Sequence, residues 1–487
     1  MKRRTKVVAT IGPASSDEFT LNALIDAGLD VARIALAHGE IADHVSRIEL
    51  IHRLSLKKGR RVGVLIDLPG PKVRAVSFPT EGVWLESDAS VVLIPYEPEN
   101  PDHVASSAER IIVEHASLLD EIMMGDLIAL GDGAVGLRIT EVNSNSAKAV
   151  VLNGGRLQGR PGVNLPPARF SLTAPTAHDL ELIKAIQKAN VVVDAIALSF
   201  VTSARDIQML RKVVGPDGPM LVAKIETTAA VDDLEAIIET ADAVMVARGD
   251  LGVRFPPEDV PHLQKHIIRT CVAFGRPVIT ATQMLESMIH APVPTRAEVS
   301  DVANAVFDGT DAVMLSAETA IGTHPVAAVE TMCRVAHRAE KEANYVQWGS
   351  RLGRQQSALM ADASSNERMT AAMTAAAWRA ALDVEAALII CCTRTGSTAR
   401  AVARFRPTAP IVAMTPSTQT MGQLSLTWGV EAFSSREYSN VDDIVWYAVE
   451  EACQMGMVKK GDIVAVLAGS PIDPEPVTDV LRLVRVR

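Results

Sequence analysis

Residues 220–250 read MLVAKIETTAAVDDLEAIIETADAVMVARGD. The stretch begins with an apolar run at 220–226, continues through an amphipathic helical segment and ends on a second apolar run at 242–248. Near-continuous runs of Val, Ile, Ala and Leu are typical of parallel strands that are covered on both faces. The stretch therefore predicts one strand, its helix and the next parallel strand of an α/β sheet.

The same unit recurs along the first two thirds of the chain. Six further β-rich runs occur at 6–12, 31–36, 61–67, 194–200, 277–282 and 311–318, so that eight strands are expected in all. Eight strand–helix units close into a (β/α)8 barrel. We predict an α/β fold with such a TIM barrel at 1–74 and 168–345.

Two intervals depart from this pattern. Residues 75–167 contain alternating stretches such as SVVLIPY and GLRITEV among turn residues, which predicts an inserted all-β lid domain that can close over the barrel mouth. The polar segment at 346–366 is expected to be a linker. Beyond it, runs such as DIVAVLAG alternate with helical segments, so that 367–487 is predicted to be a separate C-terminal α/β domain.

Composition excludes several classes of protein. A chain of 487 residues is too long for one hydrophobic core, and a net charge of −10 argues against a nucleic-acid partner. No apolar run approaches the length of a membrane span, and the amino-terminal run VVATI is too short for a signal peptide. The five cysteines have no metal-like or redox-like spacing, which predicts reduced thiols and a cytoplasmic location.

Polar side chains collect at the carboxyl ends of the predicted strands, where (β/α)8 barrels place their chemistry. Lys224 and Glu226 end the fifth strand on one face, and Asp250 follows the sixth. Two carboxylates on neighbouring strand ends suit a hard divalent ion, and Mg²⁺ fits better than zinc because no Cys or His accompanies them. A lysine beside such an ion can stabilise a transferring phosphoryl group. The next two strands end on Thr282, Ser316 and Glu318.

Each of these residues also has a structural explanation. A Lys-x-Glu strand end is often only an ion pair, Asp250 beside a glycine can be a turn residue, and a strand-end threonine can be a cap. Their coincidence at successive strand ends of one barrel favours a functional site.

Long blocks of the chain resemble the pyruvate kinase family over nearly its full length. The blocks are VAKIETTAAV (222–231), VMVARGDLGV (244–253), ITATQMLESMI (279–289), PTRAEVSDVANAVFDGTDAVMLSAET (294–319) and GVNLP (162–166). The resemblance implies a glycolytic phosphotransferase that moves the phosphoryl group of phosphoenolpyruvate to ADP and so makes pyruvate and ATP. It also implies Mg²⁺ or Mn²⁺ as cofactor and a cooperative homotetramer.

The resemblance assigns roles to residues at matching positions. Lys224 would steady the phosphoryl group in flight, Glu226 and Asp250 would hold the metal, and Arg33 and Arg74 would contact the phosphate.

Further roles follow from the same resemblance. The backbone around Ala247, Gly249 and Asp250 would receive the substrate carboxylate, and Thr282 with Ser316 would lie where the enolate is protonated. The positions that match the nucleotide pocket are Thr10, Pro13, His38 and Arg74.

The segment RIALAHG (33–39) departs from the R-x-N-x-S-H-G pattern of potassium-dependent members. Ala35 and Ala37 offer no oxygen ligand to a monovalent cation, whereas a further ligand position is retained as Asp67. Lys72 stands in a GPK segment that resembles members without a potassium requirement, and its ammonium group can replace the ion beside Asp67. We predict an activity that does not require K⁺; the alternative is that Lys72 is a solvated loop charge.

Two more departures affect the mouth of the barrel. GRPGVNLP has Arg160 and Pro161 where the family usually has two lysines, which puts nucleotide affinity and lid closure in question. Arg254 stands where a glutamate is common, and it either repels the metal or changes a neighbouring salt bridge.

The segment CTRTGSTARAVARFRP (392–407) follows an apolar run and opens a helix. Hydroxyls and backbone N–H groups at a helix start form a ready anion site, although an ordinary capped helix fits as well. In the family this segment binds a phosphorylated effector, and three acidic residues in the final loop AGSPIDPEPVTDV argue against a doubly phosphorylated sugar. The candidate effector residues are Thr393, Thr395, Gly396, Ser397 and Thr398.

Two other functions remain open from the sequence. One is a non-catalytic pyruvate-kinase-like paralogue that binds a metabolite or a partner subunit. It is consistent with Ala35, Ala37 and Pro161, which stand where the family has Asn, Ser and Lys. A lyase or aldolase on a related barrel fits the strand ends, but it does not need the inserted domain.

Overall fold

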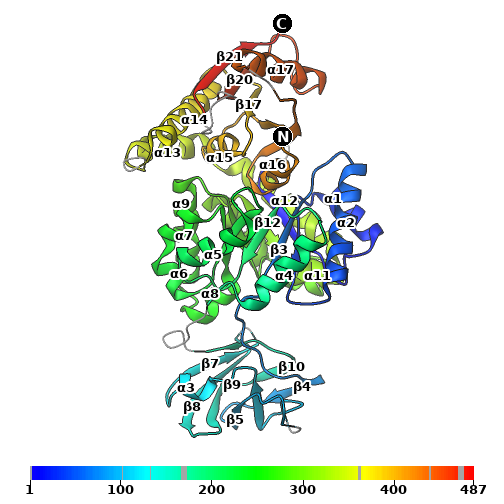
Figure 1. The fold of residues 1–487 in the computed structure, drawn as a ribbon, viewed down its shortest axis with the longest axis vertical. Coiled ribbons are helices and arrows are strands. Elements are labelled where there is room, and N and C mark those ends of the chain that lie inside the picture. The colour runs from blue at the N-terminus through cyan, green and yellow to red at the C-terminus, as the bar shows by residue number, and fades with distance from the viewer. Residues whose placement is uncertain are drawn as a thin grey trace.

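The computed structural model describes residues 3–100, 103–131, 133–165, 173–359, 363–437, 440–469 and 477–487. A (β/α)8 barrel lies in the middle of an elongated molecule, with the inserted β-rich part at one end and the C-terminal α/β part at the other (Figure 1). None of the helices in these ranges combines the length and the apolarity that crossing a bilayer requires.

Eight parallel strands close the barrel, as predicted. Around the barrel each strand pairs with two parallel neighbours, for example Lys224 opposite Met245 and Ala197 opposite Asp67. In spatial order the strands are β1 (Lys6–Thr10), β16 (Ala312–Leu315), β15 (Val278–Ala281), β14 (Ala243–Ala247), β13 (Met220–Ile225), β12 (Ala195–Leu198), β3 (Gly63–Asp67) and β2 (Val31–Ala35).

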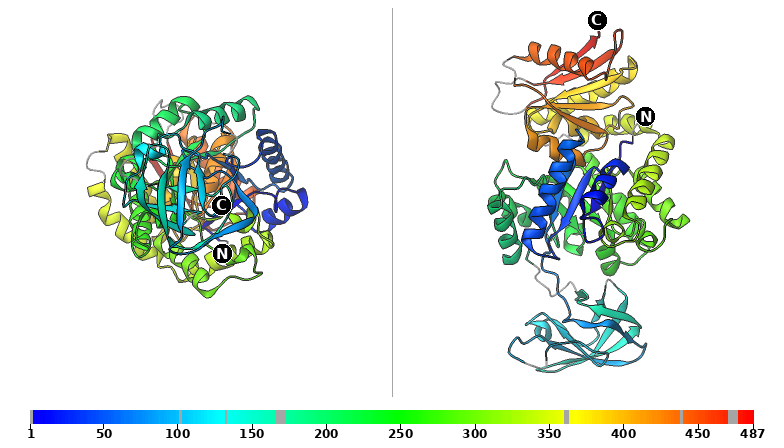
Figure 2. Two further views of the ribbon diagram at one scale, coloured as in Figure 1. Left: turned by 90° about the horizontal axis from the view of Figure 1, so that it is seen from below. Right: turned by 90° about the vertical axis from the view of Figure 1, so that its right-hand side faces the viewer.

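Helices cover the outside of the barrel (Figure 2). Long helices lie between successive strands, and shorter turns follow β13, β14 and β16 at the mouth. The helices are α1 (Glu18–Ala27), α2 (Ile41–Lys57), α4 (Ala177–Lys188), α5 (Ala204–Val214), α6 (Thr228–Asp232), α7 (Leu234–Thr240), α8 (Arg248–Arg254), α9 (Val260–Phe274), η1 (Glu286–Ile289), α10 (Arg296–Asp308), α11 (Ala317–Ala320) and α12 (Pro325–Glu342).

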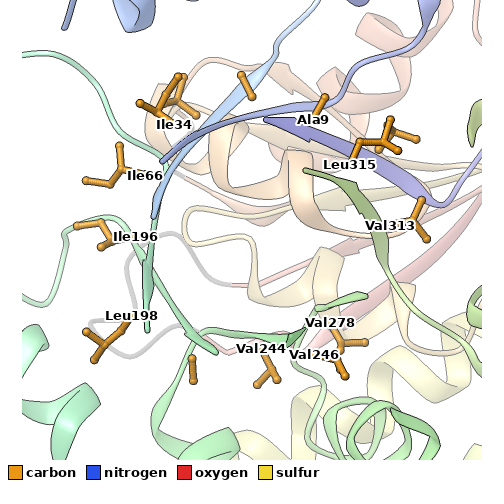
Figure 3. Close-up of a cluster of buried hydrophobic side chains, with 14 of the residues drawn as sticks. Ala9, Ile34, Ile66, Ile196, Leu198, Val244, Val246, Val278, Val313 and Leu315 are labelled. Carbon is orange, nitrogen blue, oxygen red and sulfur yellow. The ribbon is translucent and has the colours of Figure 1, made fainter. Parts of the chain in front are cut away.

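Strand alternation separates two apolar layers in the barrel. Ile66, Val244 and Val313 point outward and pack with the helices (Figure 3). The opposite faces of the strands fill the interior, where Val222 is fully buried. Because side chains alternate along a strand, Lys224 continues the inward face of Val222 at the carboxyl end of β13.

The inserted domain, which we call the lid, follows β3 and precedes β12, and its described residues form β-strands and one helical turn. Its apolar core is separate from that of the barrel. One sheet has the order β11-β7-β8-β9-β5-β6, and β4 pairs with β10. The elements are β4 (Phe78–Leu85), β5 (Ser90–Pro95), β6 (Arg110–Val113), α3 (Leu118–Glu121), β7 (Leu127–Leu130), β8 (Val135–Val142), β9 (Ala147–Asn153), β10 (Gly155–Gly159) and β11 (Val163–Asn164).

The expected linker at 346–366 is largely helical in its described residues. Helix α13 (Tyr345–Leu359) occupies most of it. Leu352 is buried in the barrel's apolar core, and the Trp348 indole donates a hydrogen bond to the carbonyl of Arg404 (2.9 Å). The segment is therefore held in place by packing against the barrel, which its polar composition does not indicate.

The C-terminal domain has a five-stranded sheet in the order β19-β18-β17-β20-β21, with only β21 antiparallel. It packs against the amino-terminal end of the barrel, where Arg406 pairs with Asp311 (2.9 Å) and Lys6 donates to the carbonyl of Val430 (2.8 Å). Its elements are α14 (Ser365–Asp383), β17 (Leu388–Cys392), α15 (Ser397–Ala403), β18 (Ile411–Thr415), α16 (Thr418–Gln423), η2 (Leu424–Leu426), β19 (Val430–Ser434), α17 (Val441–Gln454), β20 (Ile463–Ala468) and β21 (Val480–Arg485).

Candidate active site

Lys224 lies at the centre of a polar cluster at the barrel mouth. Its ammonium nitrogen is 3.4 Å from Asp67 Oδ1 and 3.5 Å from Glu226 Oε2, and it donates a hydrogen bond to Ser199 Oγ at 2.6 Å. Burial lowers the pKa of Lys224, but Asp67 and Glu226 outweigh it and raise that pKa above its ordinary value. The lysine is therefore held as a cation at a fixed place.

Arg33 supplies a second cation to the same cluster. Its Nε donates to Asp67 Oδ2 at 2.7 Å, and its Nη1 donates to Thr10 Oγ1 at 2.8 Å. Thr10 in turn donates to the carbonyl of Leu315 (2.9 Å). Burial would raise the pKa of Asp67, but Lys224 and Arg33 lower it, so that the carboxylate is ionised and orients both cations.

Glu226 is fully buried directly after β13. Its Oε1 accepts a hydrogen bond from the backbone N–H of Phe200 at 2.6 Å, while Oε2 accepts no hydrogen bond from the described residues. Burial raises the pKa of Glu226, Lys224 acts against this, and the charge of Asp250 raises it further. A buried carboxylate oxygen without a hydrogen bond, near a second carboxylate, is suited to a divalent cation.

Glu226 and Asp250 together fit a metal that keeps some ligands from water or substrate. No group of three or more His, Cys, Asp or Glu side chains lies close enough to hold a metal within the described part of the chain. Two carboxylates with open remaining positions are typical of Mg²⁺ rather than of a closed zinc site.

The loops after β14 and β15 are joined through Thr282. Its hydroxyl accepts a hydrogen bond from the backbone N–H of Gly249 at 2.7 Å and donates one to the carbonyl of Ala281 at 2.7 Å. Thr282 has a φ of +65°, which is unusual for a β-branched residue and holds the side chain against the Gly249 turn. Asp250 follows in the first turn of α8, and Ala247 ends β14 immediately before it.

Ser316 follows β16, the strand that pairs with β15. Its backbone N–H donates to Glu318 at 2.7 Å, and Glu318 also accepts from the backbone N–H of Leu285 at 3.1 Å. The Ser316 hydroxyl is buried and has no hydrogen-bond partner in the described structure.

The expected nucleotide-side residues fall into two groups. Thr10 contacts Arg33 inside the barrel, whereas Pro13 and His38 are exposed near its mouth. Partial burial lowers the pKa of His38, and the charges of Arg74, Lys72 and Arg33 lower it further, which places these cations around the imidazole.

Arg74 lies at the base of the lid rather than in the Lys224 cluster. Its guanidinium donates to the carbonyl of Arg160 at 3.1 Å, and its backbone pairs with Gly162. Arg160 in turn forms an ion pair with Glu114, and the Pro161 carbonyl accepts from Ala75 N–H at 2.9 Å.

Asp67 pairs in this structure with Arg33 and Lys224, as described above. Lys72 lies close enough to lower the pKa of His38, and it lines a cavity together with Arg254. The hypothesis that Lys72 replaces K⁺ beside Asp67 is therefore supported by the GPK segment of the sequence alone.

Arg254 lies over the ring of Phe200, with 5.7 Å from its guanidinium carbon to the ring centroid. Burial lowers the pKa of Arg254, while Glu226 and Asp250 act in the opposite direction. Arg254 therefore lies close enough to Glu226 and Asp250 to interact with their charges.

Two residues in this region escaped the sequence analysis. Ser199 follows the fourth barrel strand, and the strand-end rule that selected Lys224 would also have found it. Arg248 is buried and donates to the carbonyl of Thr282 (2.6 Å) and to Asp301 (2.6 Å), so that it fixes the loop that carries Thr282. No local pattern signals that role.

The C-terminal domain contains a cavity of about 220 Å³. Hydroxyl-bearing residues around the start of α15 line it, and hydrogen bonds join Gly396 N–H to Thr393 (2.9 Å) and Thr398 to Thr478 (2.7 Å). Residues 470–476 of the final loop, with two of its three acidic residues, Asp473 and Glu475, lie outside the described residues. The candidate effector residues that line the cavity are Thr393, Thr395, Ser397 and Thr398.

Fold and site together are those of a class of (β/α)8-barrel enzymes with an inserted β domain, and the two cations and two carboxylates at the mouth are suited to metal-assisted phosphoryl transfer. A family model for the pyruvate kinase barrel domain matches residues 2–329, and one for the pyruvate kinase alpha/beta domain matches residues 371–484. The chain belongs to the pyruvate kinase family.

Individual relatives agree over the whole chain. The pyruvate kinase of Clostridium acetobutylicum is 37% identical, with 99% of each chain covered, and that of Bacillus licheniformis is 39% identical over 96% of this chain and 78% of its own. The crystal structure of a pyruvate kinase from Cryptosporidium parvum superposes with a TM-score of 0.87 at 30% identity, covering 100% of this chain and 96% of the other.

These matches confirm the predicted family and activity. The chain is a phosphotransferase of the family that uses phosphoenolpyruvate and ADP as substrates and needs a divalent metal. They give no support to a lyase or aldolase.

Proposed function

We propose that this pyruvate kinase uses Mg²⁺ or Mn²⁺ and needs no K⁺. The observation that carries the catalytic assignment is the position of the Lys224 ammonium group, held between Asp67 and Glu226 at 3.4 and 3.5 Å in the barrel mouth. The proposed catalytic residues are Lys224, Arg33, Thr282 and Ser316.

Lys224 and Arg33 supply positive charge to the phosphoryl group. In phosphoryl transfer, charge spreads over the phosphoryl oxygens, and catalysis depends mainly on positioning and electrostatic stabilisation. Ser199 and Asp67 already orient the two cations, so that little reorganisation is needed when phosphoenolpyruvate binds.

Glu226 and Asp250 are the residues that would hold the divalent metal. When bound, the metal would neutralise charge on the substrate oxygens. Phe200 fixes the orientation of Glu226 through its backbone N–H, and Oε2 of Glu226, which accepts no hydrogen bond from the described residues, is the oxygen we assign to the metal.

The substrate carboxylate and the enolate belong on the neighbouring side of the mouth. We assign the carboxylate to the backbone around Ala247, Gly249 and Asp250, where β14 turns into α8. Thr282 and Ser316 are assigned to the face where the enolate takes its proton, and the buried, unpartnered hydroxyl of Ser316 supports a polar ligand there.

The nucleotide is assigned to the other side of the mouth, toward the lid. Exposed groups on the barrel rim, the buried Thr10 hydroxyl beside Arg33 and a cation at the base of the lid are assigned to this region, and together they suit a diphosphate. The assigned residues are Thr10, Pro13, His38 and Arg74.

Independence from K⁺ is supported by the charge already present at Asp67. Its carboxylate pairs with Arg33 and Lys224, and the side chains of Ala35 and Ala37 add no oxygen ligand near it. Lys72 is proposed to add a further positive charge in place of the ion.

At the level of the whole protein, we propose a cytoplasmic homotetramer with a phosphorylated effector in the C-terminal cavity. The five cysteines are free thiols, as expected in a reducing compartment. The hydroxyls around Gly396 and the basic Arg394 and Arg436 at the cavity suit a phosphate group.

A coupled assay tests the catalytic assignment. Purified protein, Mg²⁺, phosphoenolpyruvate and ADP are coupled to lactate dehydrogenase, with and without sugar phosphates and nucleoside monophosphates. We expect wild-type turnover and a loss of at least about a hundredfold in kcat for Lys224→Met. The control Lys184→Met changes an exposed lysine on α4 and is expected to retain full activity.

Two results would contradict the assignment. An inactive wild-type protein under every effector condition would favour the non-catalytic paralogue. Full turnover by Lys224→Met would show that another residue carries the chemistry.

A further inference from the structure

A second cavity lies between the lid and the barrel, next to the Lys224 cluster. We call it the hinge cavity because the chain segments that join the two domains line it. Its volume is about 70 Å³. The lid contributes β11 with Asn164, the segment after β3 contributes Lys72, and the barrel contributes Phe200, Thr227 and Arg254. The proposed function gives roles to Lys72 and to the backbone of Phe200 among these residues, but it places no substrate in this space.

Two buried donors at this cavity lack partners. Asn164 is 9% exposed, and its Nδ2 has no hydrogen-bond partner in the described structure. The Nε of Arg254 is likewise buried and unpartnered among the described residues. Since buried N–H groups are nearly always hydrogen-bonded in folded proteins, these two donors, one from each domain, indicate a missing acceptor.

The charge around the cavity favours an anion. Lys72 and Arg254 are both cationic, and no Asp or Glu occurs among the described residues that line it. Side-chain amide and guanidinium N–H groups match the oxygens of phosphate-like ions. A space of about 70 Å³ is large enough for an ion of that size.

We propose that this hinge cavity binds a small oxyanion such as inorganic phosphate, which joins Asn164 of the lid to Arg254 of the barrel. Arg254 stacks on Phe200, and Phe200 donates the 2.6 Å hydrogen bond that orients Glu226. Occupancy of the cavity thus stabilises one lid position and one orientation of a proposed metal ligand. The binding is independent of the catalytic assignment, whereas its effect on turnover rests on the proposed function.

Hydrogen–deuterium exchange on the full-length protein locates the anion directly. Exchange is measured with inorganic phosphate and with chloride at matched ionic strength. We expect phosphate, but not chloride, to slow exchange at 163–165 and 227–229 in the wild type. Asn164→Leu and Arg254→Gln, which change different domains, are each expected to need at least about tenfold more phosphate for the same protection.

The control and the contrary results separate this site from the others. Arg138→Gln changes an exposed arginine of β8 in the same lid and is expected to bind phosphate as the wild type does. Absence of protection at 163–165, or equal protection in all variants, would overturn the proposal. So would protection that only Lys224→Met removes, since the phosphate would then occupy the reacting site. Failure of the catalytic assignment would appear in the coupled assay and not in the exchange data.

Discussion

Thr282 shows how a single side chain can shape the mouth of the barrel. Its hydroxyl accepts from Gly249 N–H at 2.7 Å, and its backbone adopts a φ of +65°. The carbonyl of Thr282 accepts a hydrogen bond from the buried Arg248 at 2.6 Å. The residue thus links the turn that carries Asp250 to the loop after β15, besides its proposed place beside the enolate.

Replacing Thr282 by valine should therefore impair both positioning and chemistry. Thr282→Val keeps the shape but removes the hydroxyl, and we expect kcat to fall by about a hundredfold, within the range of general acid–base contributions. Thr282→Ser, which keeps the hydroxyl, should retain most of the activity. The coupled assay measures both variants, and equal activity of the valine and serine variants would show that the hydroxyl is dispensable.

Some site residues could be predicted from the sequence and others could not, and the reasons are physical. Lys224 and Glu226 could be predicted because alternation along one strand puts both on the inward face. The stacking of Arg254 on Phe200 could not, since it joins segments far apart in the chain. The partners of Asp67 could not be predicted either, because Arg33 lies on the neighbouring strand β2 whereas Lys224 lies on β13, one strand beyond the neighbour β12.

At the scale of elements, the barrel follows from the regular strand–helix pattern, but helix α13 does not follow from its composition. Its anchor residues Trp348 and Leu352 are recognisable only once the barrel surface that they cover is known. A similar long-range contact fixes the start of the barrel. Asp30, just before β2, accepts from Val7 N–H (2.8 Å) and pairs with Arg3 (2.7 Å).

This contact predicts a pH-dependent stability. Burial would raise the pKa of Asp30, but Arg3, Lys6 and Arg60 lower it to about 2. A carboxylate with a lowered pKa stabilises the folded state above its unfolded pKa of about 4, and the contribution is lost as the pH falls toward 2. Asp30→Asn, which leaves buried cations unpaired, should cost about 3 kcal/mol at pH 7.

Urea denaturation at pH 7 and pH 3 tests this prediction. The difference in midpoint between wild type and Asp30→Asn should shrink at pH 3, because the unfolded wild-type chain then takes up a proton at Asp30, whereas the folded carboxylate, with a pKa of about 2, stays mostly ionised. An exposed-site control, Asp26→Asn on α1, should show little difference at either pH. A difference for Asp30→Asn that is the same at both values would contradict the assigned charge state.

At the scale of the whole molecule, the proposed reacting groups lie on the barrel, and the two neighbouring domains are proposed to have separate roles. The lid and the C-terminal domain lie at opposite ends of the barrel (Figure 2). In the lid, the carbonyl of Arg160 accepts a hydrogen bond from Arg74, and Asn164 lines the hinge cavity. The C-terminal domain meets the opposite end of the barrel through Arg406 and Asp311. Within one chain, a signal from the proposed effector cavity to the barrel mouth would cross the barrel itself.

The requirement for a monovalent cation tests the central claim most directly. Initial rates are measured in the coupled assay at saturating Mg²⁺, phosphoenolpyruvate and ADP, with K⁺ or tetramethylammonium at equal ionic strength. Because Asp67 is already paired with Arg33 and Lys224, and because Ala35 and Ala37 offer no oxygen ligands, the account predicts rates that agree within about twofold. Activation by K⁺ of about tenfold or more, equivalent to about 1.4 kcal/mol, would contradict it.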